Sequence, residues 1–226
     1  ACLVLPSRVW RDLRGFDEVV VATGVAPRDA GIAGQDRALS YIEVLRGAPV
    51  GQRVAVIGAG GIGFDVAEFL VAQGGGATLD AELWRREWGV GDPDLTAGGV
   101  AIAAPELPAR QVWLLQRKAE KPGRGLGKTT GWIHRAALQM KGVKMWGGVS
   151  YLGIEPCGLR ILRDGVEEVL AVDNVVLCAG QMPERGLADA LAAVGIAAHV
   201  IGGADVAAEL DAKRAIDQGA RLAAGF

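Results

Sequence analysis

The stretch "QRVAVIGAGGIG", residues 52–63, constrains the fold of this chain more than any other feature. Its first half is apolar and β-branched, as is typical of a strand buried on both faces of a parallel sheet. Its second half is rich in glycine, and residues 63–73 carry apolar side chains at helical spacing. A buried strand, a glycine turn and a helix in succession predict an α/β fold.

The same rhythm recurs along the chain. Further apolar runs lie at 17–24, 111–118 and 173–180, and helical patterns lie at 129–142 and 209–224. Strands that alternate with helices in this way predict a doubly wound architecture around a parallel sheet.

Two segments interrupt this rhythm. Residues 74–110 are rich in Gly, Ala, Pro and Asp and show no clear periodicity, so we expect an excursion over the surface. Residues 147–170 alternate apolar and polar side chains around the turn signal Asp164-Gly165, which predicts a small antiparallel meander.

Composition limits the function. Glycine accounts for 34 of 226 residues, about twice its usual share, which favours a nucleotide-binding α/β protein. A net charge of -2 provides no basic field for nucleic acid. No apolar run approaches the roughly 18 residues of a membrane helix. We therefore expect a soluble protein without nucleic-acid or membrane partners.

The cysteines and the N-terminus give weaker signals. Cys2, Cys157 and Cys178 are odd in number and far apart, so they match neither a disulfide framework nor a metal site. We expect free thiols in a reducing cytoplasm and no bound metal. The chain starts without Met and without a signal pattern, and we expect it to be part of a longer protein.

The glycine turn matches a dinucleotide-binding motif. In such a site Gly58 makes the tight turn, Gly60 lets the backbone approach the pyrophosphate, and Gly63 allows close packing of helix and strand. The N–H groups at the helix start, at Gly61 and Ile62, then face the phosphates. The alternative is a glycine turn with a purely structural role.

The next strand predicts which dinucleotide is bound. An NAD site usually has an acidic residue at this strand end, whereas here the strand ends in Arg117-Lys118. Guanidinium and ammonium groups make charge-assisted hydrogen bonds to a 2′-phosphate, which favours NADPH. A solvated basic strand end is the alternative.

The stretch "KPGRGLGKTTGW", residues 121–132, looks at first like the phosphate loop of an ATPase. The spacing from Gly123 to Gly127 is one residue too short for that motif, and no strand end supplies an acid for magnesium. We therefore expect no nucleotide hydrolysis. Lys121, Arg124 and Lys128 are expected to add to the positive field around the adenosine phosphates.

Two strands with similar endings bracket this unit. One ends in Ala-Thr23-Gly24 and the other in Cys-Ala-Gly180. Such a pair looks like the strands on either side of the inserted nucleotide domain in flavoprotein reductases that bind two dinucleotides, which makes Thr23, Gly24 and Gly180 candidates for contact with FAD. Two ordinary strand ends are the alternative.

Several stretches together carry a family resemblance. They are "FDEVVVATGVAPR", "LSYIEVLRG", "VAVIGAGGIGFDVAEFL", "LLQRKAEKPGRGLGKTTGWIHR", "GVKMWGGVSYLGI", "VDNVVLCAGQMPER" and "IGGADVAAELDAKRAI". The chain resembles the C-terminal part of the bacterial NADPH-dependent 2,4-dienoyl-CoA reductases, which belong to the NADH:flavin oxidoreductases related to trimethylamine dehydrogenase.

The resemblance implies one part of a modular flavoprotein. A Rossmann-like, three-layer NADPH-binding domain at 49–175 would be inserted in a partial FAD-binding domain formed by 1–48 and 176–226. Electrons would pass from NADPH to FAD, then to a 4Fe-4S cluster and FMN, for reduction of a dienoyl thioester in the β-oxidation of unsaturated fatty acids. The cluster and the FMN barrel would belong to a missing N-terminal part, expected in cis.

The resemblance also has a departure. Many relatives place an Asp after Ile-Gly to contact the flavin, whereas here Gly203 fills that place and Asp205 lies two residues later. We take both as candidates for FAD contact, and the helix start near Glu209 as directed at the flavin ring. No residue is assigned to catalysis, and His134 is expected to be a polar helix residue. A non-catalytic adenine-nucleotide module and an inactive truncated fragment stay open as alternatives.

Overall fold

The protein's computed structural model describes residues 13, 15–74, 77–208 and 212–226. The chain divides into two compact units, one that joins Ala1–Asp29 to Gly180–Phe226 and one that is continuous from Ala30 to Ala179.

This division differs from the sequence-based boundaries at 48/49 and 175/176. The strand β10 (Asn174–Leu177) pairs in parallel with both β3 (Leu39–Ser40) and β4 (Arg53–Ile57). These pairings hold the flanking segments in the second unit, so that unit extends further than predicted at both ends.

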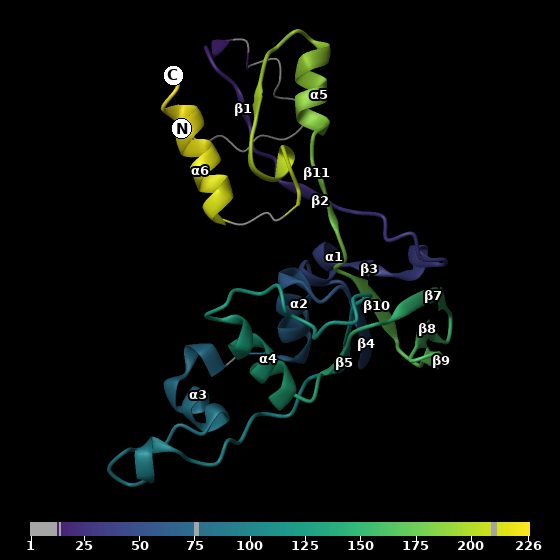
Figure 1. Ribbon diagram of the computed structural model, residues 1–226, viewed down its shortest axis with the longest axis vertical. Coiled ribbons are helices and arrows are strands. Elements are labelled where there is room, and N and C mark those ends of the chain that lie inside the picture. Colours follow the sequence, from purple (N-terminus) through teal and green to yellow (C-terminus); the bar gives the residue numbers. More distant parts are fainter. Residues whose placement is uncertain (1–12, 14, 75–76, 209–211) are drawn as a thin grey trace. The chain divides into compact units, whose positions relative to one another are not determined.

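A five-stranded parallel sheet lies at the centre of the second unit (Figure 1). Its strands follow the order β3, β10, β4, β5 (Gln111–Leu115) and β6 (Lys144–Trp146). The register of β4 against β5 runs to the pair Ile57↔Leu115, so the carboxyl ends of both strands meet at one edge of the sheet. The residues that follow these two strands are therefore neighbours.

The sheet is covered on both faces. The covering elements are α1 (Tyr41–Leu45), α2 (Gly61–Val71) and α4 (Gly131–Met140) on one face, and β7 (Ser150–Glu155), β8 (Gly158–Arg163) and β9 (Val166–Leu170) on the other. Along β4, Val54 and Val56 pack toward the helices, whereas Ala55 and Ile57 pack toward β7, β8 and β9. The period of two along a strand explains this alternation. The predicted α/β fold with a parallel sheet is confirmed.

The predicted meander is also present. β7, β8 and β9 form an antiparallel sheet, and the turn between β8 and β9 lies at Asp164 and Gly165. Both residues have positive φ, 52° and 78°, as a two-residue hairpin turn requires.

The excursion at 74–110 contains a helix that the sequence analysis missed, α3 (Ala81–Trp88), and two short 3-10 helices, η3 (Ala77–Leu79) and η4 (Ala97–Gly99). The side chain of Asp80 accepts hydrogen bonds from the backbone N–H groups of Glu82 and Leu83, and Gly89 ends the helix in the left-handed conformation. Both end signals were present in the sequence.

The first unit has a small core. β1 (Val20–Val21) pairs with β12 (His199–Val200), and β2 (Val25–Pro27) pairs with β11 (Gln181–Pro183). The first unit also contains α5 (Gly186–Ala193), the 3-10 helix η5 (Gly202–Ala204) and α6 (Ala212–Ala223). Val21, Leu191 and Ala204 form the buried centre of the first unit. The 3-10 helix η2 (Gln35–Arg37) belongs to the second unit. Within the described ranges, no helix combines the length and the apolar character needed to span a bilayer.

Candidate functional site

The glycine turn follows β4 at the carboxyl edge of the sheet. Gly58 has φ 114°, and its N–H donates to the carbonyl oxygen of Leu115 at 2.8 Å. A Cβ atom at Gly58 would lie 2.8 Å from the carbonyl oxygen of Cys178. The turn is thus confined between the ends of the neighbouring strands, which only glycine permits.

The other glycines of the motif have different surroundings. A Cβ atom at Gly63 would lie 1.7 Å from the carbonyl oxygen of Gly58, so this glycine is required where α2 packs against the end of β4. At Gly60 and Gly61 a Cβ atom would meet no protein atom within 4 Å. The protein's own packing does not require glycine at these two positions, and the space before α2 is open to a ligand.

The N-terminus of α2 has no internal cap. Gly60 is the N-cap residue, no side chain accepts a hydrogen bond from the first turn, and that turn holds no acidic residue. The N–H groups of Gly61, Ile62 and Gly63 therefore have no intrahelical partner, while the Ile62 side chain packs against the helix-side core. An uncapped helix start with its partial positive charge suits an anionic group.

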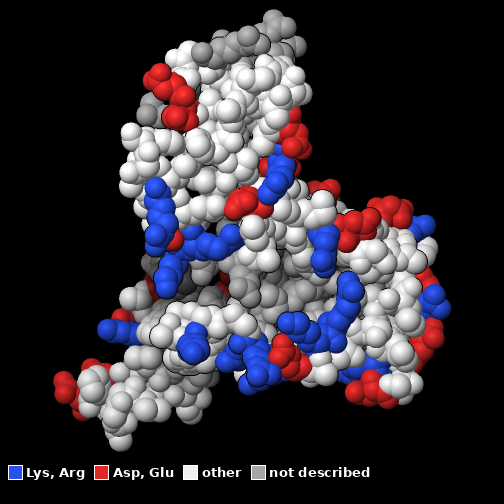
Figure 2. All heavy atoms as spheres, turned by 45° about the horizontal axis from the view of Figure 1, so that its top comes forward, with Lys and Arg blue, Asp and Glu red and all other residues white. Residues whose placement is uncertain are grey.

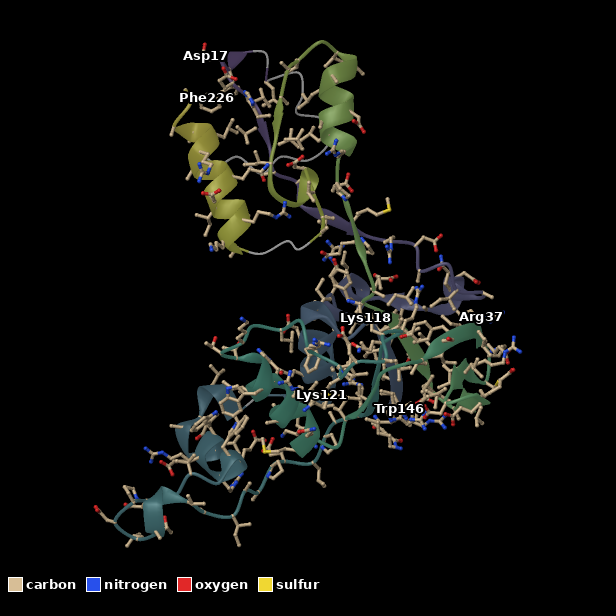
Figure 3. The ribbon with its side chains drawn as sticks, in the orientation of Figure 1. Asp17, Arg37, Lys118, Lys121, Trp146 and Phe226 are labelled. Atoms are coloured by element: carbon tan, nitrogen blue, oxygen red, sulfur yellow. The ribbon has the colours of Figure 1, made fainter. Side chains whose placement is uncertain are left out.

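The basic pair predicted at the end of the next strand lies at the same edge. Arg117 and Lys118 follow β5 and are exposed; Figure 3 labels Lys118 there and Lys121 further along the connection. One guanidinium nitrogen of Arg117 donates to the carbonyl oxygen of Ala30 at 3.4 Å, and the group lies 5.9 Å from the ring centroid of Tyr151. Lys118 Nζ lies 3.8 Å from a carboxylate oxygen of Glu120.

Gln116 was not among the predicted site residues, although it shapes this connection. Its side-chain amide donates to the carbonyl oxygens of Lys118 at 3.0 Å and Glu120 at 2.6 Å. The backbone N–H of Gly148 also donates to the Lys118 carbonyl oxygen, at 2.9 Å. These bonds fix the backbone that carries the basic pair, and a single glutamine in the sequence gave no sign of them.

The rest of the connection packs against the start of α2. A Cβ atom at Gly123 would lie 2.6 Å from the ring of Phe64. The loop borders a hollow of about 230 Å³ lined by Lys121, Arg124, Lys128 and Arg135, among others. Arg124 pairs with Glu120 at 2.9 Å, and Arg135 donates to the Gly123 carbonyl oxygen at 2.9 Å. Figure 2 shows that Lys and Arg side chains are spread over the surface, with Asp and Glu side chains among them.

Within the second unit, the glycine turn and the basic pair thus follow neighbouring strands at one edge of the sheet, whereas Lys128 lines the hollow with Lys121 and Arg124. Arg135 joins them from α4, although the sequence analysis did not single it out.

Thr23, Gly24 and Gly180 lie in the first unit, where its two segments meet. The Thr23 hydroxyl donates to the carbonyl oxygen of Glu184 at 2.5 Å, and the Gly24 carbonyl oxygen accepts from the Glu184 N–H at 3.0 Å. A Cβ atom at Gly24 would meet nothing within 4 Å, whereas one at Gly180 would lie 2.6 Å from the guanidinium of Arg28.

Gly203 and Asp205 also lie in the first unit, and Asp205 has partners of its own. Gly203 is buried within η5. The Asp205 carboxylate accepts from the Gln218 amide at 2.8 Å and lies 3.5 Å from Arg185. Gln218 in turn accepts from the Gly202 N–H at 2.8 Å, so this network ties η5 to α6. The helix start expected near Glu209 lies outside the described residues.

The two cysteines in the described part of the chain are free thiols. Burial raises the pKa of Cys178 to about 12, which keeps it protonated at neutral pH. Cys157 is exposed and free, and Cys2 lies outside the described residues. Among the described residues no three His, Cys, Asp or Glu side chains gather into a possible metal site.

Known proteins share this fold. A probable ferredoxin reductase of Castellaniella defragrans is 27% identical over 210 residues, which cover 88% of this chain and 41% of that protein. The structure of a 2-naphthoyl-CoA reductase matches with a TM-score of 0.70 and 19% identity over 94% of this chain and 28% of that one. Histamine dehydrogenase from Rhizobium sp. 4-9 matches with a TM-score of 0.64 and 17% identity over 96% and 32%.

The chain thus spans less than half the length of these relatives. The sequence pattern of the pyridine nucleotide-disulphide oxidoreductases matches residues 11–213, nearly the whole chain. This chain belongs to the pyridine nucleotide-disulphide oxidoreductase family.

Proposed function

We propose that the second unit binds NADPH and that the chain is the electron-input part of a larger flavin oxidoreductase. Family membership makes it an oxidoreductase domain that uses FAD and NAD(P)H. One observation carries the choice of NADPH: the open, uncapped start of α2 shares a sheet edge with the exposed pair Arg117 and Lys118.

Different residues of the second unit would bind the pyrophosphate and the 2′-phosphate of NADPH. The N–H groups of Gly61, Ile62 and Gly63 would hold the pyrophosphate, and the absence of a side chain at Gly60 would let it approach the backbone. No protein atom lies within 4 Å of the position that a Cβ atom would take at Gly60, so the protein leaves the pyrophosphate free to approach this residue.

The 2′-phosphate would lie at the end of β5. Arg117 and Lys118 would donate charge-assisted hydrogen bonds to it, and Lys128 would add positive potential from the neighbouring loop. The Tyr151 ring and the Ala30 carbonyl would keep the Arg117 side chain near this edge.

The first unit would contribute to an FAD site. Gly24 has φ 81° and open space at its Cβ position, which fits close approach of a ligand to the backbone. Thr23, Gly180 and Gly203 would line the same site. Asp205 would contact FAD with a carboxylate that Gln218 and Arg185 hold in place.

When bound, NADPH and FAD supply the hydride chemistry, while this chain's residues bind and orient them. For the intact protein we propose reduction of 2,4-dienoyl-CoA thioesters. The stretches that resemble 2,4-dienoyl-CoA reductases support this substrate, and the fold shared with a 2-naphthoyl-CoA reductase is compatible with it.

The double substitution Arg117→Ala with Lys118→Ala tests the NADPH assignment by calorimetric titration. Charge-assisted hydrogen bonds contribute about 1.5–3 kcal/mol each, so NADPH affinity should fall about tenfold or more, with little change for NADH. The matched control is Arg85→Ala with Arg86→Ala on α3, which removes the same charge away from the sheet edge. Equal loss of NADPH and NADH binding would refute the 2′-phosphate site.

A further inference from the structure

A second cavity lies apart from the dinucleotide edge. It encloses about 260 Å³ between α3, α4 and the C-terminal half of α2. The glycine turn lies at the opposite end of α2. Figure 1 shows α3 beside α4, so the excursion that interrupts the fold forms one wall of this cavity.

A hydrogen-bonded pair and an ion pair mark the polar ends of the cavity. His134 and Lys141 are seven residues apart along α4 and its C-cap, which places them on one face about 10 Å apart at 1.5 Å per residue. His134 Nδ1 lies 2.7 Å from a Glu68 carboxylate oxygen, and Lys141 pairs with Glu87. The surface between them is apolar and includes Ala137.

The wall opposite α4 is aromatic. Trp84 and Trp88 of α3 both line the cavity, and their rings are stacked with centroids 6.2 Å apart. Trp84 is 43% exposed, so its ring is accessible. Indole faces attract cations as well as flat apolar groups.

The charges of the lining residues favour a cation. Among the described lining residues Lys141 is the only Lys or Arg, and Glu87 neutralises it in a pair whose side chains are only 16% and 10% exposed. Glu87 also accepts from the Glu106 N–H at 3.2 Å. Glu68 accepts its hydrogen bond from an imidazole, which can donate without carrying a charge. An anion would find no uncommitted Lys or Arg here.

The size of the cavity limits the ligand further. Its volume lies just below the range of roughly 300–1,000 Å³ typical of pockets for drug-sized ligands. A two-ring molecule fits this space, whereas a dinucleotide or an acyl-CoA is too large and too negatively charged.

We propose that this cavity binds a small aromatic amine. Its ring would lie against Trp84 and Trp88, and its ammonium group would pair with Glu68. This site is independent of the NADPH site, so loss of either leaves the other testable.

Calorimetric titration with three indoles of similar size tests the proposal. They are tryptamine, which is cationic, tryptophol, which is neutral, and indole-3-acetate, which is anionic. Tryptamine should bind most tightly and indole-3-acetate most weakly. Absence of saturable tryptamine binding, or equal or tighter binding of indole-3-acetate, would overturn the proposal.

The variant Glu68→Gln separates charge from shape. It should weaken tryptamine about tenfold, equivalent to about 1.4 kcal/mol, while tryptophol affinity stays within about twofold and shows that the cavity is intact. The control Glu82→Gln removes the same charge from an exposed site on α3 that does not line the cavity. If Glu82→Gln weakens tryptamine as much as Glu68→Gln does, the assignment to Glu68 is wrong.

Discussion

At the residue scale, Tyr151 combines an unfavourable feature with a favourable one. Its hydroxyl is buried and has no hydrogen-bond partner among the described residues, while the Arg117 guanidinium lies over its ring. Burial raises the pKa of this phenol, and the positive charge of Arg117 opposes the shift. The ring therefore contributes contact with Arg117, whereas the hydroxyl carries a desolvation cost.

Removal of this hydroxyl should stabilise the protein. Tyr151→Phe keeps the ring beside Arg117 and removes an unpaired buried group, so the free energy of unfolding should rise by about 1 kcal/mol. Urea denaturation measures the change, and Tyr41→Phe, at the only other tyrosine, is the control. A loss of stability in Tyr151→Phe would show that the hydroxyl has a partner.

The two described cysteines should differ sharply in reactivity. Because the pKa of Cys178 is raised to about 12, its reactive thiolate is scarce at pH values well below that value. Iodoacetamide at about pH 8 should alkylate exposed Cys157 and spare Cys178 until the protein unfolds. Peptide mass spectrometry reads both sites, and rapid labelling of native Cys178 would contradict its burial.

At the element scale, the glycines of the turn differ in role: Gly63 is required by the packing of the fold, whereas Gly60 is not and is proposed to give a ligand access to the backbone. Gly63→Ala should destabilise the protein by about 2 kcal/mol, because the added Cβ collides with the Gly58 carbonyl. Gly60→Ala should cost less, up to about 1 kcal/mol, since nothing lies near its Cβ and only the N-cap preference for Gly over Ala is lost.

The Gly60→Ala variant also tests the proposed position of the pyrophosphate. Gly60→Ala should weaken NADPH about tenfold or more in a folded protein, because the methyl group would occupy the space proposed for the pyrophosphate. Gly61→Ala, which also has open space at Cβ, is the stability control. Unchanged NADPH affinity in Gly60→Ala would contradict the proposed approach of the pyrophosphate to this residue.

An ion pair at the opposite edge of the sheet should make stability depend on pH. The side chain and the backbone N–H of Arg53 both donate to Asp173, and these bonds lower the pKa of that carboxyl group. The stabilisation is present above the unfolded pKa of about 3.9 and is lost as the pH falls through the lower folded pKa.

Asp173→Asn should therefore be less stable than the parent at neutral pH. The difference in free energy of unfolding should shrink as the pH falls below about 4, because the parent carboxylate becomes protonated too. Urea denaturation across this range measures it, with Asp164→Asn in the exposed turn as the control. If the difference in free energy of unfolding between Asp173→Asn and the parent persisted at low pH, the loss of stability would come from the changed shape of the side chain and not from its lost charge.

The sequence predicted some elements far better than others. The apolar runs of β4 and β5 are buried on both faces, so the hydrophobic pattern alone was sufficient to predict these two strands. The run at 17–24 contains only the two-residue strand β1. The length of this strand was not predictable, because its partner His199–Val200 is remote in sequence and no local pattern indicates which residues pair. The helix α3 was missed although Asp80 and Gly89 marked its ends.

At the scale of the whole molecule, sequence reasoning identified the α/β class, and the glycine turn and the basic pair follow neighbouring strands as it expected. It could not supply the side-chain bonds that shape this edge, such as those of Gln116, because they depend on contacts absent from any local pattern. Nor could it find the cavity behind α3, whose walls come from three separate segments. The division of the chain depended likewise on the pairing of β10 with β3.

The central claim is that the second unit is an NADPH site that recognises the 2′-phosphate. Titration of the unmodified chain with NADPH and NADH, followed by quenching of its six tryptophans, tests it most directly. The account predicts saturable NADPH binding at least about tenfold tighter than NADH binding, as charge-assisted bonds to the 2′-phosphate require. Equal affinity for the two cofactors, or no binding of either, would contradict it.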